Sequence, residues 1–172
     1  MRTFLFCFAS VLLFAGAQAR ELVAGHALSM RGLGPIRIGM SIADFRKLGL
    51  ATKDQFPPQN DPDSKSCNQA SLERFQGIRV MFEEGVLTRI QISSGKTKDI
   101  HAIGIGSSEQ DVKKIYGKRL VIEPNYYDDT RHDMSVSSVD GRFGTLFETD
   151  GRKVVGFRSG LNKSVQYLEG CE

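Results

Sequence analysis

The sequence predicts an α+β fold built from two tandem units, each a short helix packed on an antiparallel β-meander. A loop-and-helix pattern at residues 36–49 returns 67 residues later at 103–117. A strand-and-turn pattern at 81–85 follows the first copy, and a similar pattern at 146–151 follows the second. Ordered recurrence of two such signals is typical of a duplicated folding unit.

The first nineteen residues carry the pattern of an export signal. Arg2 supplies a positive charge, residues 4–14 form an almost unbroken apolar run, and residues 17–19 read Ala-Gln-Ala. The apolar run is short for a membrane-spanning helix, so a retained anchor is the weaker alternative. We therefore expect a signal peptide at 1–19 and a mature, periplasmic or secreted chain without a stable membrane anchor.

The charge balance argues against two classes of partner. The chain has 23 Lys and Arg residues against 20 Asp and Glu residues, a formal net charge of +3. The basic residues form no run or stripe of the kind that tracks a phosphate backbone. We expect no binding of nucleic acid and no charge-driven binding to membranes.

The cysteines predict one disulfide. Cys7 lies in the expected signal peptide, which leaves Cys67 and Cys171 as a pair in an oxidising compartment. A bond between them would close a loop of about a hundred residues and stabilise the fold by roughly 4–5 kcal/mol in the chain-entropy model. Two free thiols are the alternative.

The first unit is expected to span residues 20–98. Residues 20–30 show only weak periodicity and receive no assignment. Ser41 is expected to cap a helix, with Asp44 three residues later, and Gly49 to end it. The spacing predicts that the buried face of this helix contains Ile42, Phe45 and Leu48.

The second unit is expected to span residues 99–172 and to repeat the cap and the end of the first helix. Ser108 and Asp111 match the cap of the first helix, and Gly117 matches its end. The buried stripe of the second helix is expected to contain Val112 and Ile115.

Alternating patterns predict the strands. Residues 78–92 and 143–158 each contain two alternating runs joined by a glycine turn, which indicates a hairpin. Further strands are expected at 134–136 and 165–168. Residues 51–76 are long, polar and proline-bearing, and we expect them to form a loop.

The helix starts resemble those of two known groups. Residues 38–41 with Gly49, and 105–108 with Gly117, are similar to the tandem units of the secreted beta-lactamase inhibitor proteins. They also resemble the single unit of the BamE-type lipoproteins of the outer-membrane assembly machinery. The resemblance implies a fold, with two units side by side and sheets that merge into one curved surface.

The whole mature chain is similar to a set of uncharacterised exported bacterial proteins. The residues that carry this resemblance are Gly34–Met40, Phe147–Asp150 and Glu169–Cys171. It implies export and the fold described above, and it implies no activity.

No catalytic constellation is found, so the predicted catalytic residues are none and the protein is expected not to be an enzyme. Ser41, Ser107 and Ser108 lie at helix starts, where capping explains them. No cofactor is expected. The weak candidates for a metal site are the neighbours Asp128, Asp129, His132 and Asp133; a solvated acidic turn is the alternative.

The leading functional hypothesis is a non-enzymatic protein that binds another macromolecule, inhibitor-like or adaptor-like, through a sheet face and the connection 123–133. If no helix covers this face, it combines residue types that are enriched at interface hot spots. The candidate partner-binding residues are Arg79, Met81, Arg89, Tyr126, Tyr127, Leu146 and Arg158. Alanine at the three arginines should then abolish capture and leave stability intact. The alternatives are a solvated sheet face, a structural accessory of envelope assembly, and a small-ligand or metal-binding module.

Overall fold

The structure is a computed structural model, and it describes residues 25–50, 52, 67–73 and 75–171. The expected signal peptide at 1–19 and most of the expected loop at 51–76 lie outside the described residues. Within the described ranges, no helix has the length and apolar character needed to cross a membrane.

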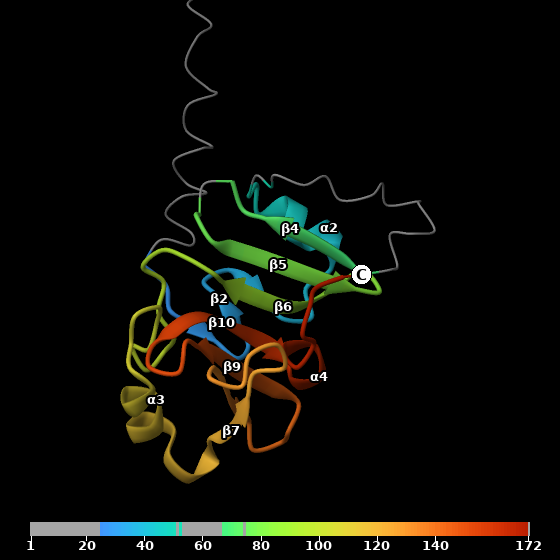
Figure 1. The fold of residues 1–172 in the computed structure, drawn as a ribbon. Helices are drawn as coiled ribbons and strands as arrows, with labels where there is room; N and C mark the ends of the chain where they lie inside the picture. The colour runs from blue at the N-terminus through green and yellow to red at the C-terminus, as the bar shows by residue number, and fades with distance from the viewer. Residues whose placement is uncertain (1–24, 51, 53–66, 74, 172) are drawn as a thin grey trace, which may run out of the picture.

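An antiparallel sheet of seven strands forms the frame of this α+β fold (Figure 1). Its strand order is β4-β5-β6-β10-β9-β8-β7. The bounds in that order are Asn68–Ser71, Ile78–Glu83, Val86–Ile92, Val154–Leu161, Phe143–Thr149, His132–Ser137 and Val121–Pro124. A second, three-stranded sheet contains β1 (Leu28–Ser29), β2 (Gly32–Leu33) and β3 (Ile36–Arg37).

The two predicted hairpins, β5–β6 and β9–β10, meet at the centre of the large sheet. Strand β6 pairs antiparallel with β10, with Phe157 opposite Ile92 and Arg158 opposite Gln91. Gly160 makes this close approach feasible, because a Cβ atom there would lie only 2.0 Å from the carbonyl oxygen of Thr88. The two halves of the chain therefore share one continuous sheet.

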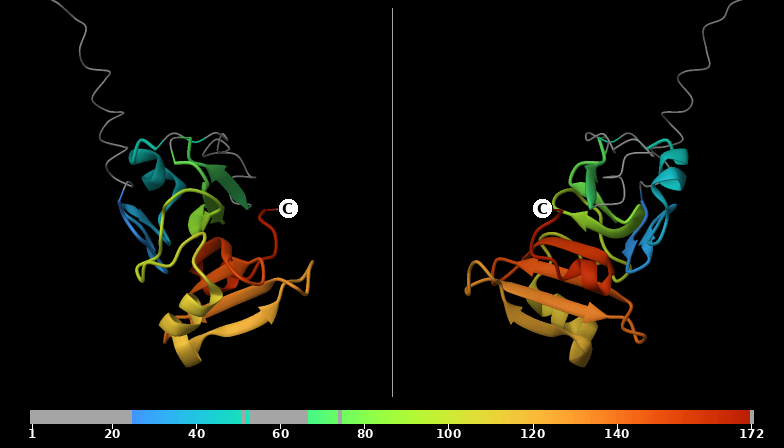
Figure 2. Two further views of the ribbon diagram at one scale, coloured as in Figure 1. Left: turned by 60° about the vertical axis from the view of Figure 1, so that its left-hand side comes forward. Right: turned by 90° about the vertical axis from the view of Figure 1, so that its right-hand side faces the viewer.

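One face of the large sheet carries the main hydrophobic core. Helices α2 (Ile42–Lys47) and α3 (Glu109–Tyr116) pack on this face. The rings of Phe45 and Phe82 meet edge to face with their centroids 5.3 Å apart, and Tyr116 lies 5.6 Å from Phe147. All four side chains are buried. In the right-hand view of Figure 2 the yellow helix α3 lies behind the sheet and the red helix α4 lies in front of it.

Both predicted helix caps are present. The Ser41 hydroxyl accepts a hydrogen bond from the Asp44 amide at 3.1 Å, and Ser108 accepts one from Asp111 at the same distance. Gly49, with φ of +65°, follows the first helix, and Gly117 caps the second. The short 3₁₀ helix η2 (Gly117–Arg119) continues from α3.

The backbone bonds at these two helix starts correspond one to one. The Gly39 amide donates to the Leu87 carbonyl and the Ile42 amide to the Gly85 carbonyl. In the second half, the Gly106 amide donates to the Val154 carbonyl and the Glu109 amide to the Arg152 carbonyl. Each residue of the second set lies 67 positions after its counterpart, the same offset as the sequence repeat. Each helix start is thus fixed to the hairpin of its own half.

Three expectations about local structure need correction, and one unassigned stretch contains a strand. Strand β4 lies inside the stretch 51–76 that was expected to be a loop, and β1 lies inside the unassigned stretch 20–30. Residues 165–168 form no strand, because the chain turns at helix α4 (Asn162–Val165) directly after β10. Ile115 is 43% exposed, and Tyr116 takes the buried position beside Val112.

The predicted disulfide is present. Cys67, just before β4, and Cys171, at the end of the described chain, are joined by an Sγ–Sγ bond of 2.03 Å across a sequence separation of 104 residues. The bond holds the segment after α4 against the edge of the sheet.

Candidate interaction surface

The sheet face that was expected to be open is covered. Helix α4 and the segment 166–171 lie on the face opposite the main core, and they bury four of the predicted contact residues. These are Met81, Arg89, Leu146 and Arg158, each no more than 3% exposed. The expectation of an open Arg-and-apolar surface is therefore wrong for these four, and of the sheet-face candidates only Arg79 stays exposed.

Arg89 holds the C-terminal segment instead of facing solvent. Its Nη1 donates to the carbonyl oxygens of Ser164, Tyr167 and Glu169 at 3.1, 3.4 and 3.3 Å. Its Nε is buried without a partner among the described residues. Burial, and then repulsion from the Arg158 guanidinium, lowers the pKa of Arg89 to about 10.

Arg158 has a similar role one strand away. Its Nε donates to the carbonyl oxygen of Val165 at 2.6 Å, and its Nη1 pairs with the Glu148 carboxylate. Together with Arg89, it satisfies carbonyl groups at the C-terminal end of α4, which a four-residue helix cannot bond internally. The two arginines are therefore structural anchors for the C-terminal segment.

A carboxylate completes this anchor, and sequence reasoning missed it. Glu83, at the end of β5, accepts hydrogen bonds from the hydroxyls of Ser164 and Tyr167. Burial alone would raise the pKa of Glu83, but hydrogen bonds led by that from Ser164 outweigh it and hold the pKa below its usual value. The contacts join residues more than eighty positions apart, so no local pattern could reveal them.

Tyr126 and Tyr127 lie on the connection between β7 and β8 and are mostly exposed. Their side chains are 73% and 66% exposed. The two rings contact each other edge to face with centroids 5.1 Å apart. The Tyr127 hydroxyl donates to the Glu169 carboxylate at 2.6 Å, which links this connection to the C-terminal segment.

The backbone that carries the tyrosines is fixed by local hydrogen bonds. The Asn125 side chain accepts from the Tyr127 amide at 3.1 Å and donates to the Asp133 carboxylate at 3.1 Å. Asp128 accepts from both the amide and the hydroxyl of Thr130. These short-range bonds favour one conformation of the connection and reduce the entropy lost when a partner binds.

The connection 123–133 is acidic in a chain whose formal net charge is +3. It contains four carboxylates and one arginine. We call residues 123–133 together with Glu169 the tyrosine loop surface. Charge complementarity favours a partner with basic side chains around the point where the tyrosine rings dock.

The backbone edge of β7 is a poor site for pairing with another strand. The backbone amide of Asn125 donates to the Arg131 carbonyl on the β8 side. Because backbone groups alternate in direction along an antiparallel strand, the backbone groups of Ile122 and Pro124 point toward the free edge. Proline has no N–H to offer there, and such an outward proline is a common protection of sheet edges. Side chains, and not the strand edge, are therefore the available contacts.

The weak metal candidates are not brought together as ligands. The described residues contain no group of three or more His, Cys, Asp or Glu side chains placed to hold a metal ion. The contact that His132 makes is with Glu109 on α3, where its Nδ1 lies 2.7 Å from a carboxylate oxygen. Asp133 bonds to Asn125 instead.

Glu109 is a buried carboxylate at the start of α3. It accepts from the Thr149 hydroxyl at 2.6 Å and from Lys113 at 3.1 Å, in addition to its contact with His132. Burial alone would raise the pKa of Glu109, but these hydrogen bonds outweigh it and hold the pKa below its usual value. The cluster fixes α3 to β8 and β9.

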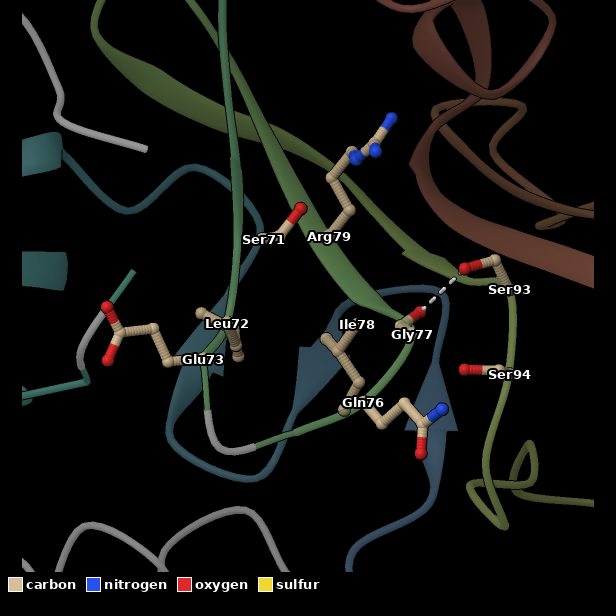
Figure 3. A pocket seen from close by; sticks show the side chains of 9 residues that line it. All are labelled: Ser71, Leu72, Glu73, Gln76, Gly77, Ile78, Arg79, Ser93 and Ser94. Carbon is tan, nitrogen blue, oxygen red and sulfur yellow. Dashed lines mark hydrogen bonds between the residues drawn. The ribbon is translucent and has the colours of Figure 1, made fainter. Parts of the chain in front are cut away.

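An open pocket of about 440 Å³ lies beside the β4–β5 turn (Figure 3). Its wall includes Ser71, Arg79, Ser93 and Ser94, and the Ser93 hydroxyl donates to the carbonyl oxygen of Gly77. In Figure 3 the Arg79 side chain extends away from the rest of the pocket lining. The polar groups do not converge on one point, so we assign no ligand to this pocket.

The described fold and surface define a class in structural terms only: an α+β chain with a large and a small antiparallel sheet, a disulfide-anchored C-terminal segment and an exposed tyrosine pair. No protein-family model matches the chain, and no curated protein matches its sequence. A solved structure, the uncharacterized protein yfeY from Escherichia coli, is similar in fold with a TM-score of 0.51 and 9% sequence identity. The match covers 78% of this chain and 99% of that chain. At this identity the likeness concerns the fold alone.

Proposed function

We propose that this protein is an exported, non-enzymatic binding protein that uses the tyrosine loop surface to bind another protein in the bacterial envelope or outside it. The observation that carries the proposal is the pair Tyr126 and Tyr127. Tyrosine is enriched at interface hot spots, because it offers a large, rigid contact area with a polar tip. Both rings lie side by side and are mostly exposed, so they offer their faces to a partner.

The fixed backbone of the loop supports the same proposal. An exposed aromatic pair on a freely moving loop would lose much conformational entropy on binding. Here the hydrogen bonds of Asn125 and the contact between Tyr127 and Glu169 already restrict the loop. The surrounding carboxylates would steer a basic partner toward the rings and would make the association rate sensitive to salt.

Export is supported by the signal pattern at 1–19 and by the Cys67–Cys171 disulfide, since disulfides persist mainly in oxidising compartments. The finer description of the fold is also part of the proposal. The repeated helix caps and their constant offset of 67 residues support two tandem units that arose by duplication, as the resemblance to the inhibitor proteins and BamE-type lipoproteins implies.

The experiment is an affinity capture from envelope extract with three matched baits, all in the oxidised form. The first bait is the native chain, and the second carries Tyr126→Ser and Tyr127→Ser. The third carries Val139→Ser, which removes a fully exposed apolar side chain from a different loop. A protein retained by the native and Val139→Ser baits and lost by the tyrosine variant supports the proposal. Equal retention by all three, or no specific retention, contradicts it.

A further inference from the structure

A second cavity lies away from the tyrosine loop surface, where the small sheet, the C-terminal end of α3 and the large sheet meet. Its volume is about 270 Å³. One wall comes from the segment after β1, a second from the turn that follows Lys98, a third from α3 and η2, and the floor from β9. The lining residues that the argument uses are Met30, Arg31, Ile100, His101, Tyr116 and Arg119.

The interior of this cavity is mostly apolar and aromatic. Tyr116 is buried at the base, and the His101 ring meets it edge to face with centroids 5.3 Å apart. Ile100 is 60% exposed at the mouth, although it is a large aliphatic side chain. A cavity with apolar walls and a few convergent polar groups is the usual form of a small-molecule site.

Two arginines without an ion-pair partner among the described residues lie at the rim. The Arg31 guanidinium stacks on the Phe143 ring at 4.3 Å, and the Arg119 guanidinium lies 6.0 Å from the centroid of Tyr116. Among the described residues neither guanidinium forms an ion pair, while each is held in place by an aromatic face. Arginine recognises carboxylates through its planar fork of donors, so both groups are poised to accept an anion.

The carboxylate in the wall does not compete for these cations. Asp99 is buried, and it accepts from the Tyr116 hydroxyl and from the amides of His101 and Ile103. Burial, and then the Asp99 carboxylate, raises the pKa of Tyr116, which keeps this hydroxyl protonated as a donor. The polar groups of Asp99 and Tyr116 therefore satisfy each other, and the rim keeps a net positive charge.

The turn that forms the mouth is strained. Ala102 has a φ of +66°, a left-handed conformation that is unfavourable for a non-glycine residue. The bonds from Asp99 to the turn hold the backbone in this conformation and present Ile100 and His101 at the opening. Strain of this kind is concentrated at ligand sites, where the surrounding structure maintains it.

We propose that this cavity binds a small aromatic carboxylate of one or two rings, with its ring between Met30, Ile100 and Tyr116 and its carboxylate at Arg31 and Arg119. The aromatic body matches the rings of Tyr116 and His101, and a volume of about 270 Å³ accommodates a molecule of one or two rings. The site is separate from the tyrosine loop surface and does not depend on the function proposed for it.

The test uses two probes of nearly equal shape and different charge, 2-naphthoate and 2-naphthamide. Each is titrated into the oxidised chain while backbone amide chemical shifts are recorded by NMR. We expect saturable shifts for 2-naphthoate that centre on Ile100, His101 and Tyr116, with binding at least 10-fold tighter than for the amide. Equal affinity for the two probes, shifts centred elsewhere, or no saturation would each overturn the proposal.

The variant with Arg31→Gln and Arg119→Gln tests the role of the charges. It should lower the affinity for 2-naphthoate at least 10-fold and remove the preference for the acid over the amide, with an unchanged fold by its amide spectrum. Arg152→Gln, at an exposed arginine outside the cavity, is the matched control and should bind like the native chain. Retained preference in the double variant, or equal loss in the control, would overturn the assignment of the carboxylate to these arginines.

Discussion

Replacing Arg89 by alanine should destabilise the fold strongly, whereas alanine at the exposed Arg79 should not. The Nη1 group of Arg89 lies within hydrogen-bond distance of three carbonyl oxygens of the C-terminal segment. Its two hydrogens can form two good hydrogen bonds at the same time. A hydrogen bond from a charged donor contributes about 1.5–3 kcal/mol, and a buried carbonyl left without a donor adds to the loss. Desolvation of the guanidinium offsets part of this gain, as its lowered pKa indicates. We therefore expect a loss of about 2–4 kcal/mol for Arg89→Ala.

The assay is urea unfolding of the oxidised chain, followed by circular dichroism. With an m-value of about 2 kcal/mol/M, the loss corresponds to a midpoint lower by about 1–2 M. Arg89→Met should lose less, because it keeps the buried stem and removes the desolvated charge. Arg79→Ala should stay within about 0.5 kcal/mol of the native chain. If Arg89→Ala unfolds at the same urea concentration as Arg79→Ala, the anchoring role described for Arg89 is wrong.

Three further predictions concern the pairing of β6 with β10, the disulfide and acid stability. Gly160→Ala should destabilise the fold by more than about 2 kcal/mol in urea unfolding, because its Cβ would contact a carbonyl oxygen at 2.0 Å. Gly156→Ala in the same strand should cost much less, since its nearest contact would be a side-chain oxygen of Glu148 at 3.1 Å, and a reversed order would contradict the close approach of β6 and β10 at Gly160. Removing the Cys67–Cys171 bond by paired serine substitutions should lower the unfolding free energy by up to about 4–5 kcal/mol, and an unchanged value would exclude the loop-closure argument. Because the pKa of Glu109 is lowered by folding, its stabilisation is present above about pH 4.3 and is lost as the pH falls through the folded value. The stability difference between the native chain and Glu109→Gln should therefore shrink on acidification, as measured by urea unfolding between about pH 6 and pH 3.

Local features of the fold could be predicted from the sequence because their causes are local. Ser41 and Ser108 are caps because a short hydroxyl side chain reaches the amide three residues later. The hairpin turns and the disulfide followed from glycine positions and from the count of cysteines. The offset between the two repeats also appeared directly as a repeat of residues.

The covered sheet face could not be predicted in this way. Residues 162–165 are too few to show a helical period, so nothing in the sequence indicated that the chain turns back over the sheet. The partners of Arg89 are backbone carbonyls 75–80 residues away, and every residue type has a carbonyl. Alternation alone placed Met81 and Leu146 on an outward face and could not tell whether another element covers that face.

The candidate site also has a part that the sequence predicts and a part that depends on the fold. Tyr126 and Tyr127 stand out in the sequence because they are adjacent aromatics in an acidic, polar connection, and the structure leaves them exposed. The support from Asn125 and Glu169 depends on the three-dimensional path of the chain. The cavity beside Asp99 was not predicted, because its lining comes from segments that lie far apart in the sequence.

The most direct test of the central claim is the dissociation constant of the captured partner for purified native protein and for the variant with Tyr126→Ser and Tyr127→Ser. Loss of two hot-spot rings should weaken binding by about 30-fold to 900-fold, at about 1–2 kcal/mol for each ring. Native binding should also weaken as salt is raised, because acidic residues surround the rings. Affinities within about 3-fold of each other would contradict the account and would place the binding surface elsewhere on the molecule.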